Sequence, residues 1–394
     1  MGSMTKWLLR RFDLELRRLQ PSPHTDIVHL KADGKARGTV LLAYLVAPFQ
    51  LAKGQAPSNA HTHHMESLLM AQTFQELGYH VDVIDYRNRD FRPKKDYALF
   101  VSARVHFAAI AERLDSKCVK IAHMDTSHFL SNNAAAYSRL LALRERRGAA
   151  THSLKLIEAN WAAEHADYLT ILGNDVTLGT YQYAGKPMHT LPVPTPNEYP
   201  SPAGKDFEAA RNRYLWIGSH GFAHKGLDLV LEAFAQMPDK HLTVCGPVDH
   251  RSERHFAAAY HQELYETINI ETVGWIDVGS EDFQRLLDTT LGLIYPSACE
   301  GQAGAAVTCV RAGLIPLISR ASGLDVGDFG AILADCTIDE IKRVVRQTSA
   351  RSLGELQDMA ARAWEHAQAQ HSRDAYLQRY REVIEAIIED AAAR

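Results

Sequence analysis

A lysine behind a small-residue loop gives the first indication of chemistry in this sequence. The run from Trp216 to Leu227 reads WIGSHGFAHKGL, so a predicted strand ends in glycine turns and a helix begins after Lys225. Backbone N–H groups in such a turn can approach an anion closely, and the lysine adds positive charge for a phosphate. The Gly-x4-Gly-Lys-Ser/Thr order of a P-loop is absent, so a solvated lysine at a helix start remains the alternative.

A glutamate among small and apolar residues is the second chemical feature. The run from Tyr295 to Gly304 reads YPSACEGQAG and is followed by a helix of small residues. A carboxylate at Glu300, beside two glycines and a helix N-terminus, can hold sugar hydroxyls while the helix end faces a diphosphate. A helix-capping Glu300 is the alternative, but a cap does not account for the glycines at 301 and 304.

Two polar residues at the end of a predicted strand form the third feature. The run from Lys120 to His128 reads KIAHMDTSH. His123 lies at the carboxyl end of the strand, where parallel sheets bind their ligands, and Asp125 follows two residues later. The alternatives are a buried histidine with satisfied hydrogen bonds and an aspartate that caps a turn.

Alternating strands and helices must position these groups. The predicted strands are 39–46, 79–86, 97–101, 118–123, 214–218, 242–246, 270–273, 291–295 and 314–319, and the helices between them include 65–77, 108–114, 227–235 and 256–265. Strands that alternate with helices of this length pair in parallel through crossovers. Each half of the chain is therefore predicted to be a Rossmann-like, doubly wound α/β domain.

A proline-rich segment separates the two halves. The run from Leu191 to Pro202 carries five prolines, which exclude it from helix interiors and central strands. The tail from Ser352 to Ala393 is helical throughout and can cross back to the first domain. We predict two facing domains with a cleft between them, bounded as follows: an N-terminal amphipathic helix and lead-in at 1–36, a first domain at 37–195, a linker at 196–204, a second domain at 205–372 and a C-terminal helix packed on the first domain at 373–394.

Composition limits the classes of partner. With a net charge of -4, the chain has no general basic field, so nucleic acid is not expected. No run approaches the roughly 18 apolar residues that cross a bilayer, and we expect a cytoplasmic protein. The stripe Leu8, Phe12, Leu16 and Leu19 beside several arginines predicts an amphipathic helix, which docks on its own domain or contacts the inner face of a membrane peripherally.

Several motifs in one order resemble a known family. The stretch from about Leu215 to Ala334 resembles the donor domain of retaining glycosyltransferase family 4, which has the GT-B fold. The matching residues are Gly218, Lys225-Gly226, Pro296-Ser297, Glu300-Gly301, Gly304 and Gly313-Leu314-Ile315-Pro316. Several matches in order, each in a strand–turn–helix context, are far more specific than any one of them.

Two positions depart from the family pattern. Ser219 stands where the family has an arginine, which leaves more of the diphosphate charge to Lys225 and backbone amides. Thr308 stands where the family has a second glutamate that commonly contacts the ribose hydroxyls. A threonine offers one hydroxyl with a shorter reach.

The resemblance implies a glycosyltransferase of polysaccharide biosynthesis. It would move a hexose-type sugar from a nucleotide-diphosphate sugar to a glycan or lipid-linked acceptor, with retention and without a metal ion or other cofactor. A basic run, Arg139, Arg144, Arg146 and Arg147, is compatible with such an acceptor or is simply a solvated face. The predicted catalytic residues are His123, Lys225 and Glu300, and the predicted binding residues are Asn59, His64, Asp125, Gly218, Ser219, Lys225, Gly274, Glu300, Gly301, Gln302, Ala303, Gly304 and Thr308.

Other interpretations remain open at this point. A nucleotide-sugar epimerase on the same fold would need an added acid/base set, and a general base at Asp125 would make transfer inverting. The changes at Ser219 and Thr308 would also suit a non-catalytic nucleotide-sugar-binding subunit. The cluster His61, His63, His64 and Glu66 suggests a metal site, but no closed ligand set is evident, and a phosphate or acceptor contact is better supported.

Overall fold

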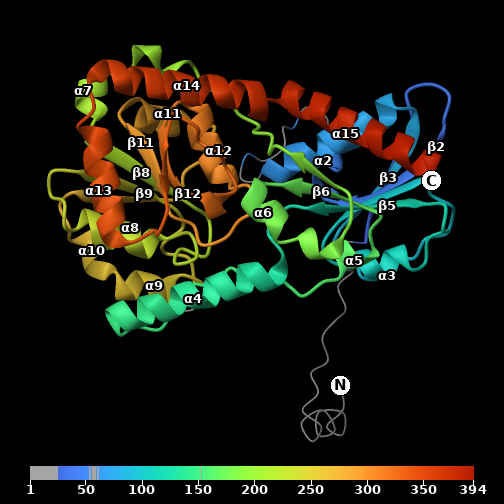
Figure 1. The fold of residues 1–394 in the computed structure, drawn as a ribbon, viewed down its shortest axis with the longest axis horizontal. Helices are drawn as coiled ribbons and strands as arrows, with labels where there is room; N and C mark the ends of the chain where they lie inside the picture. The colour runs from blue at the N-terminus through green and yellow to red at the C-terminus, as the bar shows by residue number, and fades with distance from the viewer. Residues whose placement is uncertain (1–24, 53–54, 56–58, 60–61, 152) are drawn as a thin grey trace, which may run out of the picture.

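The computed structural model contains two α/β domains that lie side by side (Figure 1). It describes residues 25–394 apart from 53–54, 56–58, 60–61 and 152. The amphipathic helix predicted at 6–19 and the histidine at position 61 lie outside the described residues. The predicted α/β class, with two facing Rossmann-like domains and a crossing C-terminal helix, is confirmed.

The first domain is built on a seven-stranded sheet of order β1-β3-β2-β4-β5-β6-β7, in which β1 is antiparallel to β3 and the other pairs are parallel. Its strands are β1 (Ile27–Leu30), β2 (Gly38–Tyr44), β3 (Tyr79–Asp85), β4 (Leu99–Ala103), β5 (Val119–Met124), β6 (Tyr168–Leu172) and β7 (Met188–Leu191). Val40 to Ala43 are fully buried because helices cover both faces of the sheet, which is why β2 is an unbroken apolar run.

Two layers of helix cover this sheet. One core cluster joins alternate β2 residues to Phe74 of α2 and to Tyr380 of α15, and the other joins the intervening residues to α3 and α5. The helical elements of this half are η1 (Ala47–Phe49), α2 (Thr62–Glu76), α3 (Phe107–Ala111), α4 (Phe129–Arg147), α5 (Ala162–His165), α6 (Asp175–Gly179) and η2 (Gln182–Ala184).

The second domain has a six-stranded, fully parallel sheet of order β10-β9-β8-β11-β12-β13. Its strands are β8 (Arg213–Ile217), β9 (His241–Cys245), β10 (Ile270–Gly274), β11 (Gly292–Tyr295), β12 (Ile315–Ser319) and β13 (Ala331–Leu333). The helical elements are η3 (Pro202–Gly204), α7 (Phe207–Ala210), α8 (Leu227–Phe234), α9 (Arg254–Ala259), α10 (His261–Tyr265), α11 (Glu281–Asp288), α12 (Gly304–Arg311), η4 (Arg320–Ser322) and α13 (Ile338–Ser349).

The C-terminal helices connect the domains. α14 (Leu353–His371) packs on α12 of the second domain, and α15 (Arg373–Ala393) packs on α2 of the first (Figure 1). Ser372 separates them and caps α15, because its hydroxyl accepts a hydrogen bond from the amide of Ala375. The chain therefore crosses back between the domains, as predicted.

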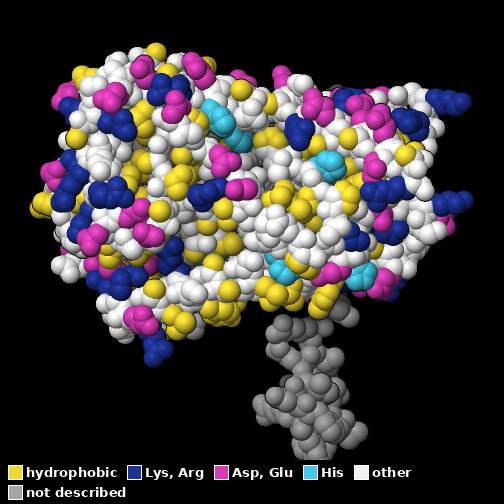
Figure 2. All heavy atoms as spheres, in the orientation of Figure 1, with side chains coloured by type: hydrophobic (Ala, Val, Ile, Leu, Met, Phe, Trp, Pro, Cys, Tyr) yellow, Lys and Arg dark blue, Asp and Glu magenta, His cyan; other side chains and the backbone are white. Residues whose placement is uncertain are grey.

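Long α4 also reaches the second domain, which changes the interpretation of the basic run. Arg139 donates to the carbonyl of Pro296 at 3.0 Å, Arg146 to Asp228 at 2.6 Å, and Arg147 to Glu263 at 2.6 Å. These three arginines join the two domains. Neither of the interpretations given above, an acceptor contact or a solvated face, is needed to explain them. Figure 2 shows positive and negative side chains interspersed over one face of the molecule.

Candidate active site

A cavity of about 540 Å³ lies between the domains, where the carboxyl ends of both sheets meet. Several residues that directly follow a strand line the cavity: Tyr86 after β3, Asp125 after β5, Gly218 after β8, Gly246 after β9 and Trp275 after β10. Parallel α/β sheets bind ligands at this edge, since the loops after the strands are free to carry functional groups. The fold thus makes this cavity the candidate active site.

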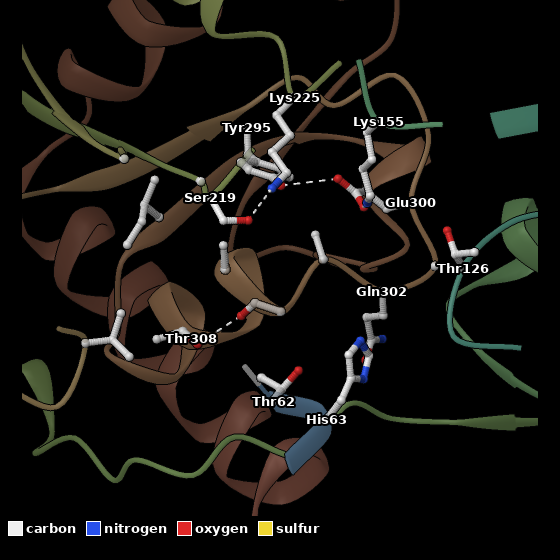
Figure 3. Close-up of a pocket in the computed structure, with 18 of the residues that line it drawn as sticks. Thr62, His63, Thr126, Lys155, Ser219, Lys225, Tyr295, Glu300, Gln302 and Thr308 are labelled. Carbon is white, nitrogen blue, oxygen red and sulfur yellow. Dashed lines mark hydrogen bonds and ion pairs between the residues drawn. The ribbon is translucent and has the colours of Figure 1, made fainter. Parts of the chain in front are cut away.

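Lys225 enters the cavity from the loop after β8 (Figure 3). Its Nζ lies 3.3 Å from Oγ of Ser219, and its carbonyl accepts a hydrogen bond from Trp216. Gly226 follows with φ of 76°, and a Cβ there would lie 2.5 Å from the carbonyl oxygen of Pro296. Only glycine fits this left-handed turn, so the Lys225-Gly226 pair fixes where the ammonium group enters the cavity.

The ammonium group of Lys225 loses its proton more easily than that of an exposed lysine, because its pKa is lowered. Burial lowers the pKa of Lys225 to about 8, although the nearby carboxylate of Glu300 opposes that shift. An anion in the cavity would favour the charged form of the lysine. Lys225 is therefore suited to binding a negatively charged ligand near neutral pH.

Glu300 lies in the turn after β11 and is only 5% exposed. Its Oε1 accepts hydrogen bonds from Ser297 at 3.1 Å and Tyr295 at 3.3 Å, and its other oxygen pairs with the ammonium group of Lys155. Burial alone would raise the pKa of Glu300, but Lys155 and Lys225 outweigh it and lower the pKa to about 2. The side chain is therefore an ionised hydrogen-bond acceptor, of the kind that can orient hydroxyl groups.

The small residues after Glu300 allow the two domains to approach. A Cβ at Gly301 would lie 2.5 Å from the carbonyl oxygen of Asp125, and one at Gly304 would lie 3.1 Å from Oγ1 of Thr62. Thr62 begins α2 and Gly304 begins α12, so the N-terminal ends of these two helices meet at the cavity wall. Both ends carry partial positive charge, which favours an anion in the adjoining part of the cavity.

Asp125 lines the cavity but is already paired. Arg104 donates to both of its oxygens, from Nε at 2.6 Å and from Nη2 at 3.0 Å. Burial would raise the pKa of Asp125, but Arg104 dominates and holds that pKa well below its usual range. A carboxylate so strongly stabilised in its charged form is a poor general base.

Behind the cavity wall lies a buried polar network centred on Glu66 of α2. Glu66 contacts His63 at 2.9 Å, His123 at 3.1 Å, Tyr44 at 2.8 Å and Tyr376 of α15 at 3.4 Å. Burial would raise the pKa of Glu66, but the two histidines lower it to about 2. For His63 the directions are reversed. Burial would lower its pKa, but the hydrogen bond to Glu66 outweighs burial and raises that pKa. His63, which lines the cavity, thus has an ionised partner behind it.

The structure brings most of the predicted binding residues together. Those that line the cavity are Asn59, Asp125, Gly218, Ser219, Lys225, Glu300, Gly301, Gln302, Ala303, Gly304 and Thr308. Thr308 donates its hydroxyl to the carbonyl of Gly304 at 2.9 Å, so that hydroxyl is already used within α12.

Three predicted residues lie elsewhere. His123 is 1% exposed and contacts Glu66 and Thr170 beneath the wall, so the prediction that it reaches the cleft is corrected. His64 does not line the cavity, because it lies about 100° around α2 from His63, which does. Gly274 is the last residue of β10, and the cavity wall begins with the next residue.

Arg104 and Lys155 line the cavity without having been predicted as site residues, and His63 was considered only as a member of the histidine cluster. Arg104 directly follows β4, so the position after a predicted strand was a usable signal. His63 was one residue from the predicted His64. Lys155 lies in the irregular segment between α4 and α5, where no periodic pattern marks it.

Two further properties concern the described residues alone. None of their helices is both long and apolar enough to cross a membrane. Within the same part of the chain, no three His, Cys, Asp or Glu side chains are grouped so that they could hold a metal ion.

The two domains and their shared cavity define the GT-B fold. No family model matches the sequence, and no curated protein matches it either. Sucrose-phosphate synthase from Thermosynechococcus elongatus matches with a TM-score of 0.59 at 13% identity, over 88% of this chain and 99% of that chain. HepE from Anabaena, solved with UDP and glucose, matches with a TM-score of 0.57 at 12% identity over the same shares. WaaG, a glycosyltransferase involved in lipopolysaccharide biosynthesis, matches with a TM-score of 0.51 at 18% identity, again over 88% and 99%.

Proposed function

We propose that this protein is a glycosyltransferase that takes a hexose-type sugar from a nucleotide-diphosphate donor. One observation carries the proposal: Lys225 and Glu300 line the same interdomain cavity, at the carboxyl ends of two facing parallel sheets. Among the structural neighbours, HepE has been solved with UDP, with UDP and glucose, and with UDP-glucose. These complexes support a nucleotide-sugar donor here.

The proposed chemistry follows from where charge develops. As the bond between the sugar and the diphosphate breaks, negative charge accumulates on the leaving diphosphate. Lys225 and the N-terminal end of α12 are fixed beside that position, and such fixed groups lower the barrier without reorganising. Glu300 accepts hydrogen bonds from the sugar hydroxyls and so orients the ring. Closure of the domains excludes the water that would hydrolyse the donor.

The cavity favours transfer with retention over the alternatives. An epimerase would need a protonated acid and a free base, but Glu300 and Asp125 both have lowered pKa values and cationic partners. The same pairing of Asp125 with Arg104 argues against a base-catalysed inverting reaction. The resemblance to retaining glycosyltransferase family 4 supports retention, and WaaG supports a glycan or lipid-linked acceptor.

The test measures release of nucleoside diphosphate from UDP-, GDP-, ADP- and dTDP-hexoses when glycan and lipid-linked acceptors are supplied to take the sugar. We expect the wild type to release nucleoside diphosphate from one of these donors. Lys225→Ala should reduce that release by about 10²- to 10³-fold, because a fixed charge-stabilising group is lost. Glu300→Ala should reduce it by about 10²-fold, because the sugar ring is no longer held in the reactive orientation. Glu281→Ala, at a side chain exposed on α11, is the matched control and should leave the rate unchanged. Activity that survives both cavity changes undiminished would rule out this site.

A further inference from the structure

Lys155 is a lysine of the first domain that lines the interdomain cavity beside Glu300 of the second domain. The segment that carries it packs directly on the loop after β8. The amide of Ala223 donates to Oγ of Ser153 at 3.3 Å, and a Cβ at Gly221 would lie 2.9 Å from Cβ of Lys155. No larger residue fits at 221 without moving the segment.

Two asparagines of α4 hold the segment from the other side. Nδ2 of Asn132 donates to the carbonyl of Lys155 at 2.8 Å. The side chain of Asn133 donates to the carbonyl of Ile157 at 2.9 Å and accepts from its amide at 2.9 Å. Because the backbone at Lys155 and Ile157 is bonded to a long helix, the Lys155 side chain enters the cavity from a fixed point.

Two lysines, one from each domain, lie close to the carboxylate of Glu300. Lys155 pairs with it, and Lys225 acts on it electrostatically. Lys225 is also acted on by the buried carboxylate of Glu253 in the second domain, whereas Lys155 has Glu300 as its partner. Arg104 also lines the cavity, but Asp125 accepts both of its hydrogen bonds. The two ammonium groups therefore lie where the first and second domains meet at Glu300 (Figure 3).

We infer that Lys155 is a second phosphate-binding cation for the donor, supplied by the first domain. The inference rests on the proposed function and deepens it. When the donor enters, the ammonium group of Lys155 moves from Glu300 to a diphosphate oxygen, and Glu300 is released to accept from the sugar hydroxyls. With Ser219 at the loop position, Lys155 and Lys225 share the diphosphate, one from each domain.

The first experiment measures the dissociation constants of UDP, ADP, GDP and dTDP by isothermal titration calorimetry. Lys155→Met should raise the dissociation constant of the nucleotide that the wild type binds by about tenfold or more, because a charge-assisted hydrogen bond is lost. Lys155→Arg keeps the charge and should recover most of the affinity. Lys117→Met, at an exposed lysine of the first domain away from the cavity, is the control and should bind like the wild type.

A second experiment separates phosphate contact from mere positioning of Glu300. In Glu300→Gln the carboxylate charge is gone, so Lys155 has no anion to position there. If Lys155 contacts phosphate, the double variant Glu300→Gln with Lys155→Met binds the nucleotide chosen by the wild type about tenfold more weakly than Glu300→Gln alone. If Lys155 serves only to hold Glu300, the double variant and Glu300→Gln bind that nucleotide equally.

The outcomes are distinct. Equal affinity of the wild type and Lys155→Met for the nucleotide that the wild type binds, or equal affinity of Glu300→Gln and the double variant for it, overturns the inference while the proposed function stands. A wild type that binds none of the four nucleoside diphosphates overturns the proposed function and this inference with it. Circular dichroism of each variant confirms that weaker binding does not come from unfolding.

Discussion

The low pKa of Lys225 makes donor binding depend on pH in a defined direction. Burial lowers that pKa to about 8, and a diphosphate is bound best by the charged lysine. Raising the pH therefore removes the binding form of the protein. From about pH 7 to about pH 9, the charged fraction of a group with this pKa falls from about 0.9 to about 0.1, so the nucleoside diphosphate that the wild type binds should bind about tenfold more weakly. Its terminal phosphate is already mostly ionised at about pH 7, and the rest of that ionisation would strengthen binding as the pH rises, which is the opposite trend.

Calorimetry in buffers of different ionisation enthalpy tests both the affinity and the proton. At about pH 9 the complex should take up close to one proton per bound nucleoside diphosphate, because binding recharges Lys225. Lys225→Arg is the matched control: a guanidinium stays charged across this range, so its affinity for the same nucleotide should not fall as the pH rises. A wild-type affinity that is constant or rises from neutral to alkaline pH would refute the assignment of Lys225 to the diphosphate.

Three further predictions follow from the contacts. Gly301→Ala should lower the free energy of unfolding by about 1–3 kcal/mol in thermal denaturation, because its Cβ would lie 2.5 Å from the carbonyl oxygen of Asp125; an unchanged Tm would contradict this close approach. Glu66→Gln should destabilise by about 3 kcal/mol, since it leaves His123 without its buried partner, whereas Glu112→Gln at an exposed ion pair should change stability by less than about 1 kcal/mol. Equal effects of the two would show that the buried network contributes little. Excess EDTA should leave transfer activity intact, because lysines and helix ends neutralise the diphosphate; loss of activity that Mg²⁺ restores would refute this.

The strand–helix alternation was enough to predict both sheets, including the edge strand β10, but three edge strands were missed. β1, β7 and β13 have four, four and three residues, too short for a period of two to be visible. β6, Tyr168–Leu172, was also not predicted. It is a five-residue buried run, and a short apolar run does not distinguish a strand from a helix.

The site was predicted best where its residues are close in sequence. The turn from Glu300 to Gly304 lies in the cavity as a unit, because one loop carries all of it. His123 is the second-last residue of β5. Its position in the sequence could not show whether its side chain faces the helix layer or the cleft. Lys155 meets Glu300 across 145 positions of sequence, and only the packing of α4 against the second domain brings them together.

The last helix has a consequence for synthesis on the ribosome. α15 places Tyr376 and Tyr380 against α2, where both rings are fully buried, and Phe74 of α2 meets Tyr380 at a ring separation of 5.9 Å. The α2 residues in these contacts lie about three hundred positions earlier in the chain. The face of α2 therefore stays uncovered until α15 has left the exit tunnel. A nascent chain halted before residue 373 would expose that apolar surface to chaperones, whereas a chain that includes α15 conceals it.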